Sequence, residues 1–150
     1  MQFSIKAAEI QDIPHIARLF DAYRVFYEQA SDLEAAANYL RDRLQKGESQ
    51  IYWAQDLSGT GLGFVQLYPS FSSVSMQRLW ILNDLFVAEQ ARRMGVGEGL
   101  MERAKEMAIS TKAKGLQLET GENNLKAQSL YEKLGYVKND EYFVYYLSTV

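Results

Sequence analysis

The 150-residue sequence contains no cysteine and a single histidine, His15. The lack of cysteine excludes a disulfide framework, a thiolate metal site and a cysteine nucleophile. One histidine argues against a histidine-rich metal site and against a Ser-His-Asp triad, so we expect no bound metal. His15 falls in the first turn of an expected helix with no visible partner. We therefore interpret it as a structural or surface residue.

Long apolar runs and prolines are also scarce. The longest strongly apolar run, at residues 79–82, is far too short to span a bilayer. Residues 1–10 alternate polar and apolar side chains and lack the apolar stretch of a signal peptide. We expect a cytoplasmic protein with no membrane partner. Two prolines cannot form a Pro-rich linker, and no repeat is visible, so residues 1–150 are expected to form a single domain.

The charge balance is mildly acidic. The chain has 16 Lys and Arg residues against 19 Asp and Glu residues, a net charge of −3. A nucleic-acid-binding protein usually carries a basic patch, so we expect no nucleic-acid partner. An acidic surface is compatible with a cationic partner.

The hydrophobic pattern predicts helices interspersed with strands. Alternating or continuous apolar residues predict strands at 3–7, 50–55, 61–68, 77–87, 116–120, 136–138 and 141–147. Apolar spacings of three and four predict helices at about 13–30, 31–46, 95–112 and 125–134. Ser31 and Glu34 form a capping-box pattern at the start of the second helix. This order predicts an α/β (α+β) domain with a mixed sheet of about seven strands and helices on both faces.

The last predicted strand is apolar on both faces. Tyr142, Val144 and Tyr146 alternate with Phe143, Tyr145 and Leu147. One helix layer can cover only one face, so the other must meet another element, a substrate or a second subunit. From this aromatic segment we predict a homodimer.

The segment from Leu85 to Gly97 carries the clearest chemical pattern. A strand is expected to end at Val87 and a helix to begin near Gly95, so residues 92–97 offer successive backbone N–H groups at a helix N-terminus. The glycines allow a ligand to approach the backbone, and two arginines add positive charge. The pattern indicates either a phosphate or pyrophosphate site or a strand-to-helix turn that uses glycine for its shape.

Two other phosphate motifs do not match this segment. A P-loop requires Lys and Ser or Thr after its last glycine, but Gly97 is followed by Glu98 and Gly99. A dinucleotide-binding fingerprint requires a third glycine where this chain has Leu100.

The pattern Arg92-x-x-Gly95-x-Gly97 at a strand–loop–helix junction resembles the pyrophosphate loop of the GNAT superfamily of N-acetyltransferases. A second stretch, Asn124-x-x-Ala127-x-x-Leu130-Tyr131-x-x-Leu134-Gly135-Tyr136, is similar to the second cofactor motif of that superfamily. The strand order also matches the superfamily's mostly antiparallel sheet, so the resemblance covers essentially the whole chain. It implies an acetyl-CoA-dependent enzyme that transfers an acetyl group directly from the thioester to a primary amine.

Two further stretches resemble the histone- and polyamine-type subgroup. They are Tyr23-x-x-Phe26-Tyr27 in the first helix and Ile81-Leu-Asn83-Asp84-Leu85-Phe86-Val87 in the long strand, where the subgroup usually has Tyr in place of Phe86. This likeness implies that the acceptor is a small amine, a polyamine or a lysine-containing peptide.

The resemblance also implies which residues hold acetyl-CoA. Leu85 and Val87 offer backbone groups to the pantetheine arm, with Phe86 between them. The pyrophosphate is held mainly by backbone amides of Arg92, Arg93, Met94, Gly95, Val96 and Gly97. In the second motif, Asn124 hydrogen-bonds the pantetheine or orients its helix, and Ala127 and Tyr131 complete the cofactor-binding set.

For the catalytic groups, the resemblance makes Tyr131 the general acid that protonates the leaving thiolate. A tyrosine pKa of about 10 keeps it protonated at neutral pH. The attacking amine must lose a proton first, since its pKa is near ~10.4, so a base is required. Asp84 is our first choice of base and Glu119 the alternative. Relatives in the polyamine branch often have Glu-Asp where this chain has Asn83 and Asp84.

The acceptor is expected to meet Tyr27, Glu28 and Asp84. Glu28 and Asp32 lie where the first two helices join, and they either attract a cationic substrate or form ordinary solvated surface. A second hypothesis is a non-catalytic CoA-binding or oligomeric interaction module on the same fold. It is favoured by the open choice of base and by the two-sided apolar last strand.

Overall fold

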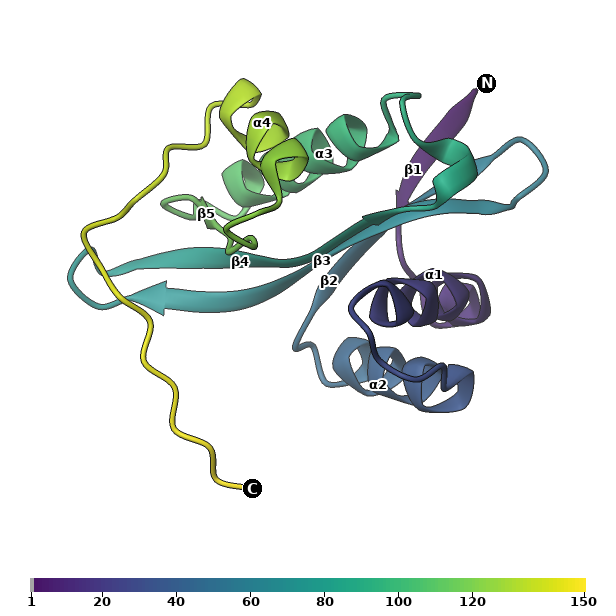
Figure 1. The fold of residues 1–150 in the computed structure, drawn as a ribbon, viewed down its shortest axis with the longest axis horizontal. Coiled ribbons are helices and arrows are strands. Elements are labelled where there is room, and N and C mark those ends of the chain that lie inside the picture. The colour runs from purple at the N-terminus through teal and green to yellow at the C-terminus, as the bar shows by residue number, and fades with distance from the viewer. Residues whose placement is uncertain (1) are drawn as a thin grey trace. The chain divides into compact units, whose positions relative to one another are not determined.

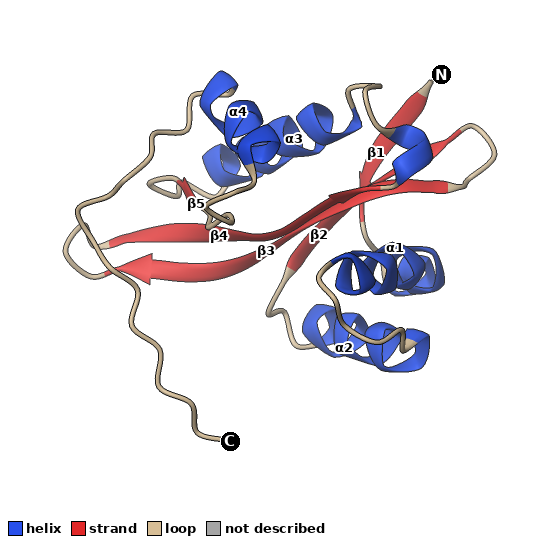
Figure 2. Ribbon diagram, in the orientation of Figure 1, coloured by secondary structure: helices blue, strands red, loops and turns tan. Residues whose placement is uncertain are grey.

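A computed structural model describes residues 2–150 of the chain. The chain forms two compact units, the first ending at Glu119 and the second running from Thr120 to Val150. The first unit contains a five-stranded sheet and three helices, and the second contains one helix and an extended C-terminal segment. Figure 2 shows the helices and strands along the chain.

The sheet runs in the order β1-β2-β3-β4-β5. Its strands are β1 (Phe3–Ala7), β2 (Gln50–Asp56), β3 (Gly61–Ser72), β4 (Gln77–Val87) and β5 (Leu116–Gln117). The first four strands are antiparallel neighbours, and β5 pairs parallel with β4. The predicted mixed, mostly antiparallel sheet is therefore confirmed, but the expected number of about seven strands is wrong.

Helices cover both faces of the sheet, as predicted. Helices α1 (Ile13–Phe26) and α2 (Leu33–Gln45) lie on one face and α3 (Val96–Ser110) on the other (Figure 1). On the α1 face, apolar side chains of the two helices and the sheet form one buried cluster that includes Ile13, Ile16, Phe20, Leu40, Trp53 and Phe64. On the other face, α3 approaches β3 at Gly63, where an added Cβ would lie 2.8 Å from the carbonyl oxygen of Phe86 and 3.2 Å from Val96.

Local hydrogen bonds set the ends of the first two helices. Helix α1 ends at Phe26, short of the predicted end near Ala30, and Glu28 then takes a left-handed φ of 64°. The cap of α2 is Asp32, whose Oδ1 accepts from the N–H of Ala35 at 3.1 Å. The predicted capping box at Ser31 is wrong, because the Ser31 hydroxyl donates to Asp21.

The second unit begins with a capped helix. Asn124 caps α4 (Leu125–Lys133) by accepting from the N–H of Ala127 at 3.3 Å, and Gly135 follows with a φ of 95°. The remaining residues form no strand, so the strands predicted at 136–138 and 141–147 are wrong. A strand needs a neighbour for its N–H and C=O groups, and no β-ladder within residues 2–150 includes this segment. The six side chains of 142–147 are between 78% and 92% exposed.

No helix in the described residues, 2–150, has both the length and the apolar character needed to cross a membrane.

Candidate active site

A buried acid, Asp84, lies at an irregularity in β4. Gln66 of β3 pairs with Asp84, but the next residue, Leu67, pairs with Leu82, which leaves Asn83 as the extra residue of a β-bulge. Such bulges re-aim side chains and are frequent beside active sites. Asp84 is 5% exposed, whereas its neighbour Asn83 is exposed. The bulge therefore places a buried carboxyl next to a surface-accessible amide.

Three side chains hydrogen-bond the Asp84 carboxyl. Gln66 Nε2 donates to Oδ2 at 2.7 Å, and Asn83 Nδ2 donates to Oδ1 at 3.2 Å. The Tyr23 hydroxyl of α1 also donates to Asp84. Burial raises the pKa of Asp84 above its ordinary value, and the hydrogen bonds from Gln66, Tyr23 and Asn83 oppose that rise. A carboxylate whose pKa is raised binds a proton more readily, as a general base must.

Tyrosines extend this polar cluster across the α1–α2 face. The hydroxyl oxygens of Tyr39 on α2 and Tyr68 on β3 lie 2.7 Å apart. Burial raises the pKa of Tyr68, with further contributions from the hydrogen bond to Tyr39 and from the negative charge of Asp84. Tyr68 is thus a neutral hydroxyl at physiological pH. Arg43 lies over the Tyr39 ring, 4.9 Å from its centroid.

The loop between β4 and α3 has the geometry of an anion site. After Val87, a 3-10 turn (Glu89–Ala91) leads into residues 92–95, and Arg93 and Gly95 take positive φ values of 67° and 84°. Gly95 is the N-cap of α3 and has no side chain to cap it, so the first-turn N–H groups have no acceptor within the helix. An added Cβ at Gly95 would meet no heavy atom within 4 Å. The loop backbone is therefore open to a ligand at this point.

Arg92 contacts the strand that precedes this loop. Its Nε donates to the carbonyl oxygen of Val87 at 3.2 Å. This hydrogen bond ties the arginine to the end of β4, where the resemblance placed backbone groups for the pantetheine arm.

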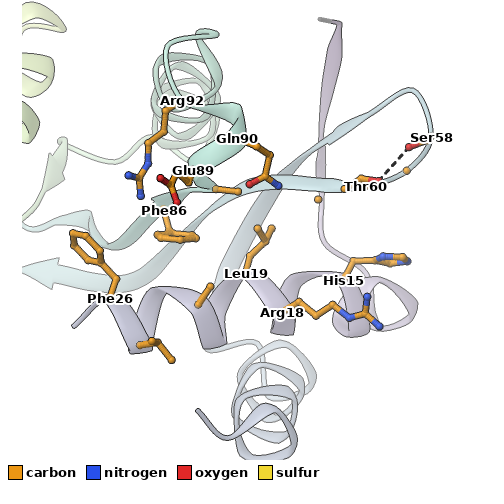
Figure 3. Close-up of a pocket in the computed structure, with 15 residues that line it drawn as sticks. His15, Arg18, Leu19, Phe26, Ser58, Thr60, Phe86, Glu89, Gln90 and Arg92 are labelled. Atoms are coloured by element: carbon orange, nitrogen blue, oxygen red, sulfur yellow. Dashed lines mark hydrogen bonds between the residues drawn. The ribbon is translucent and has the colours of Figure 1, made fainter. Parts of the chain in front are cut away.

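A cavity of about 700 Å³ opens on the α1 face of the first unit. It is lined by α1, the β2–β3 turn, the end of β4 and the turn that follows. Figure 3 shows Phe26 and Phe86 at one end, below Arg92 and Glu89, and His15 and Arg18 at the other end. Two residues expected to bind the cofactor, Phe86 and Arg92, therefore line the same cavity.

The residues of the second predicted cofactor motif all lie in the second unit. Asn124 caps α4, and its side-chain oxygen accepts from the N–H of Ala127. Ala127 and Tyr131 lie on α4, where Tyr131 is half-buried and its ring centroid is 6.0 Å from that of Tyr136. These contacts make Tyr131 part of a small aromatic pair within this unit.

Other predicted site residues lie in different surroundings. Glu119, the alternative base, was expected on a strand, but β5 ends at Gln117 and Glu119 is exposed in the segment after it. Tyr27 and Glu28 are exposed just after α1, and the Tyr27 ring lies against Tyr23 at 5.0 Å. Among residues 2–150, no group of three or more His, Asp or Glu side chains is arranged to hold a metal ion.

Sequence reasoning missed the polar partners of Asp84, above all Gln66. Gln66 is fully buried in the middle of β3, within a run of buried residues from Leu62 to Leu67. A lone glutamine inside such an apolar run was the available signal, since a buried amide needs hydrogen-bond partners. Tyr39 and Tyr68 carry no such signal, because tyrosine is common in this chain.

The mixed sheet, the uncapped helix start after β4 and the buried acid on that strand agree with the fold that the resemblance implied. The chain belongs to the acetyltransferase (GNAT) family, whose model matches residues 16–136. The GNAT resemblance is thereby confirmed at the level of the superfamily.

Individual relatives agree with this assignment. An uncharacterized N-acetyltransferase of Bacillus subtilis, YhfO, is 49% identical over 147 residues, covering 98% of this chain and 97% of that protein. The D-amino-acid N-acetyltransferase HPA3 of Saccharomyces cerevisiae is 32% identical over 136 residues, covering 88% of this chain and 83% of that protein. A crystal structure of a probable acetyltransferase superimposes with a TM-score of 0.92 at 42% identity, covering 98% of each chain.

Proposed function

We propose that this chain transfers the acetyl group of acetyl-CoA directly to a primary amine, with Asp84 as the general base. The observation that carries the proposal is the buried, hydrogen-bonded Asp84 on β4, the strand that leads into the anion-binding loop. An alkylammonium has a pKa near ~10.4 and must lose a proton before its nitrogen can attack. A carboxyl whose pKa is raised by burial is suited to accept that proton, directly or through a water molecule.

One proton of the alkylammonium passes to Asp84, and the neutral amine then attacks the thioester carbonyl carbon to form a tetrahedral oxyanion. When the carbon–sulfur bond breaks and the amide forms, the thiolate of CoA takes the proton of the Tyr131 hydroxyl. The second proton of the nitrogen returns to the Tyr131 oxygen through water, and Asp84 releases its proton to solvent. The chain has no cysteine, so no protein thiol can take the acetyl group, and the proposed transfer passes through no acetyl-enzyme.

Acetyl-CoA is proposed to bind along the end of β4 and the loop that follows. The N–H groups at the start of α3 and the side chains of Arg92 and Arg93 suit its pyrophosphate. Residues 85–87 lead into this loop, and Phe86 and Arg92 line the adjacent cavity. We assign Asn124, Ala127 and Tyr131 of the second unit to the same co-substrate on the strength of the family motif.

The proposed acceptor is a small amine, a polyamine or a lysine-containing peptide, as in the histone- and polyamine-type subgroup. The α1 motif and the β4 motif support the subgroup, and the acid Asp84 among tyrosine hydroxyls suits a cationic group. Tyr27 and Glu28, exposed after α1, are proposed to meet the acceptor. The name of HPA3 states that it acts on D-amino acids, so the panel of acceptors includes amino acids of both configurations.

Two proposals concern the whole chain. The family match at residues 16–136 runs through both compact units, which supports a single functional domain over residues 1–150. The exposed apolar side chains of 142–147 support a homodimer, since monomeric proteins rarely leave such a continuous apolar segment in water.

The experiment that tests the function is a screen for CoA release. Purified protein is mixed with acetyl-CoA and a panel of polyamines, amino acids, aminoglycosides and basic peptides, and free thiol is followed with a thiol reagent. Because the protein has no cysteine, every thiol detected is CoA. Release that depends on one class of amine supports the proposal, and no release with any amine contradicts it.

A thermal-shift measurement separates this proposal from a non-catalytic CoA-binding module. Acetyl-CoA at 100 times its dissociation constant should stabilise the fold by about 2.7 kcal/mol. A shift without turnover on any amine favours the binding module, and no shift contradicts both functions.

A further inference from the structure

Three buried polar side chains form a continuous row from the end of α2 to β4. Ser49, between α2 and β2, donates from Oγ to Gln66 Oε1 at 2.8 Å, and Gln66 Nε2 donates to Asp84 Oδ2 at 2.7 Å. Ser49 and Asp84 are each 5% exposed, and Gln66 is fully buried. Burying such groups is costly unless each is hydrogen-bonded, and here the row supplies the partners.

The direction of these hydrogen bonds matches an ionised Asp84. The Ser49 hydroxyl donates to the amide oxygen of Gln66, and the amide N–H group donates to the carboxyl. In the reverse orientation the amide oxygen would face a carboxylate oxygen unless Asp84 carried a proton. The charged carboxylate therefore favours this orientation of Gln66, and Ser49 supplies the partner of the amide oxygen in it.

The two oxygens of Asp84 have different surroundings. Oδ2 is held by the fully buried Gln66, whereas Oδ1 accepts from Asn83, whose side chain is exposed. The Tyr23 hydroxyl is a third donor to the carboxyl. Gln66 thus fixes the carboxyl from its buried side. Other titratable groups near the carboxyl are Tyr23 from α1 and Tyr68 from β3, and Tyr68 in turn meets Tyr39 of α2. Arg43 lies over the Tyr39 ring.

We propose that Gln66, hydrogen-bonded in turn by Ser49, is a positioning residue that fixes Oδ2 of Asp84 and so holds the carboxyl in the orientation in which it takes the proton of the acceptor amine. The inference rests on the proposed role of Asp84 as base. Neither Gln66 nor Ser49 touches the reacting atoms. Their contribution is to hold the carboxyl in one orientation and to stabilise its charged form, which keeps the base deprotonated at lower pH.

The test compares Q66M, S49A and D84N with the unaltered protein, and Q50M serves as the control. Methionine matches the length of glutamine without its amide, and Gln50 is an exposed glutamine at the start of β2. Two quantities are measured for each protein. One is the titration midpoint of the Asp84 carboxyl, followed by NMR of protein labelled with ¹³C at aspartate carboxyls. The signal is assigned by its absence in D84N. The other is the acidic limb of the pH profile of kcat/KM.

In Q66M both the midpoint and the acidic limb should move to higher pH by about one unit, a tenfold change in proton affinity, because a hydrogen bond to the charged form is lost. S49A should move both in the same direction by less, since Gln66 keeps its hydrogen bond to Asp84 but loses the hydroxyl that holds its amide oxygen. Q50M should move neither. S49A removes only one buried hydroxyl, so it keeps the test decisive if Q66M fails to fold.

Failure of the inference and failure of the proposed function give different results. If the rates of Q66M and S49A fall equally at every pH and the titration midpoint does not move, the row of buried side chains is merely structural. That result overturns the inference. A midpoint that moves while the acidic limb stays in place overturns it as well. If D84N keeps the full rate and the same limb, Asp84 is not the base, and the proposed mechanism fails whatever the other variants show.

Discussion

Gln66 and Asp84 are register partners on β3 and β4, and the Gln66 amide donates to the Asp84 carboxyl at 2.7 Å. The acid is therefore held by a side chain of the neighbouring strand at the bulge, where the two strands change register. Burial raises the pKa of Asp84 while this hydrogen bond opposes the rise. The pKa of the proposed base, Asp84, therefore depends on the register in which β3 and β4 pair.

Asp84→Asn should change how stability depends on pH. The folded pKa of Asp84 lies above its unfolded value of about 3.9, so its favourable contribution is complete below that value and is lost as pH rises through the folded pKa. Asparagine does not ionise. The stability of Asp84→Asn relative to the parent should therefore rise with pH across this window, by roughly 1.4 kcal/mol per unit of pKa elevation. Urea unfolding at a series of pH values measures it.

A stability difference for Asp84→Asn that does not change with pH would contradict the raised pKa.

Tyr131→Phe should slow turnover by roughly 10²- to 10⁴-fold while acetyl-CoA affinity stays largely unchanged, because only the donated proton is lost. Steady-state kinetics and a thermal-shift titration with acetyl-CoA measure the two effects. Tyr52→Phe, a buried tyrosine on β2, is the matched control and should keep its rate. An unchanged rate for Tyr131→Phe would remove this residue from its assigned role.

Gly95→Ala tests the loop before α3, and Gly115→Ala, just before β5, is its matched control. An added Cβ meets no heavy atom within 4 Å at either position, but only Gly95 has a positive φ, of 84°. Alanine at 95 should therefore lower the free energy of unfolding by about 1–2 kcal/mol and weaken acetyl-CoA binding, with little loss at 115. Equal losses of stability and of acetyl-CoA binding at both positions would contradict a specific role for the left-handed backbone of Gly95.

The homodimer should depend on the exposed apolar segment at 142–147. Light scattering at tens of micromolar protein should give twice the monomer mass of 17.2 kDa. A double variant, Phe143→Lys and Tyr145→Lys, should return the mass to that of the monomer, because two charges enter a segment that is 85% and 92% exposed at these positions. A monomeric parent protein at this concentration would overturn the dimer.

Local patterns were sufficient to predict much of the first unit. The strand at 77–87 has the predicted bounds, and α3 begins one residue after Gly95, because periodicity and a helix-start glycine are local properties. The motif at residues 92–97 likewise indicated a loop whose backbone, with a left-handed Gly95, is now visible. Asp84 was predicted as the base from its place in the motif at residues 81–87, and its burial in the structure explains why its pKa is raised.

The remaining features depend on contacts between distant residues. Alternation at 141–147 is compatible with a strand, but pairing requires a partner that the pattern does not specify, and the segment forms none. Glu119 was placed on a strand that ends two residues earlier. The bulge at Asn83 and the row from Ser49 to Asp84 arise from register and packing, which single-residue patterns do not encode.

The central claim is direct transfer from acetyl-CoA to an amine, and one experiment measures it most directly. Protein at a concentration comparable with acetyl-CoA is mixed with an active amine, and free thiol, acetylated amine and the intact mass of the protein are followed together. We predict one acetylated amine for each thiol released, with the protein staying at 17.2 kDa throughout. Thiol release without acetylated amine, or a protein that gains and then loses the mass of an acetyl group as product forms, would contradict direct transfer.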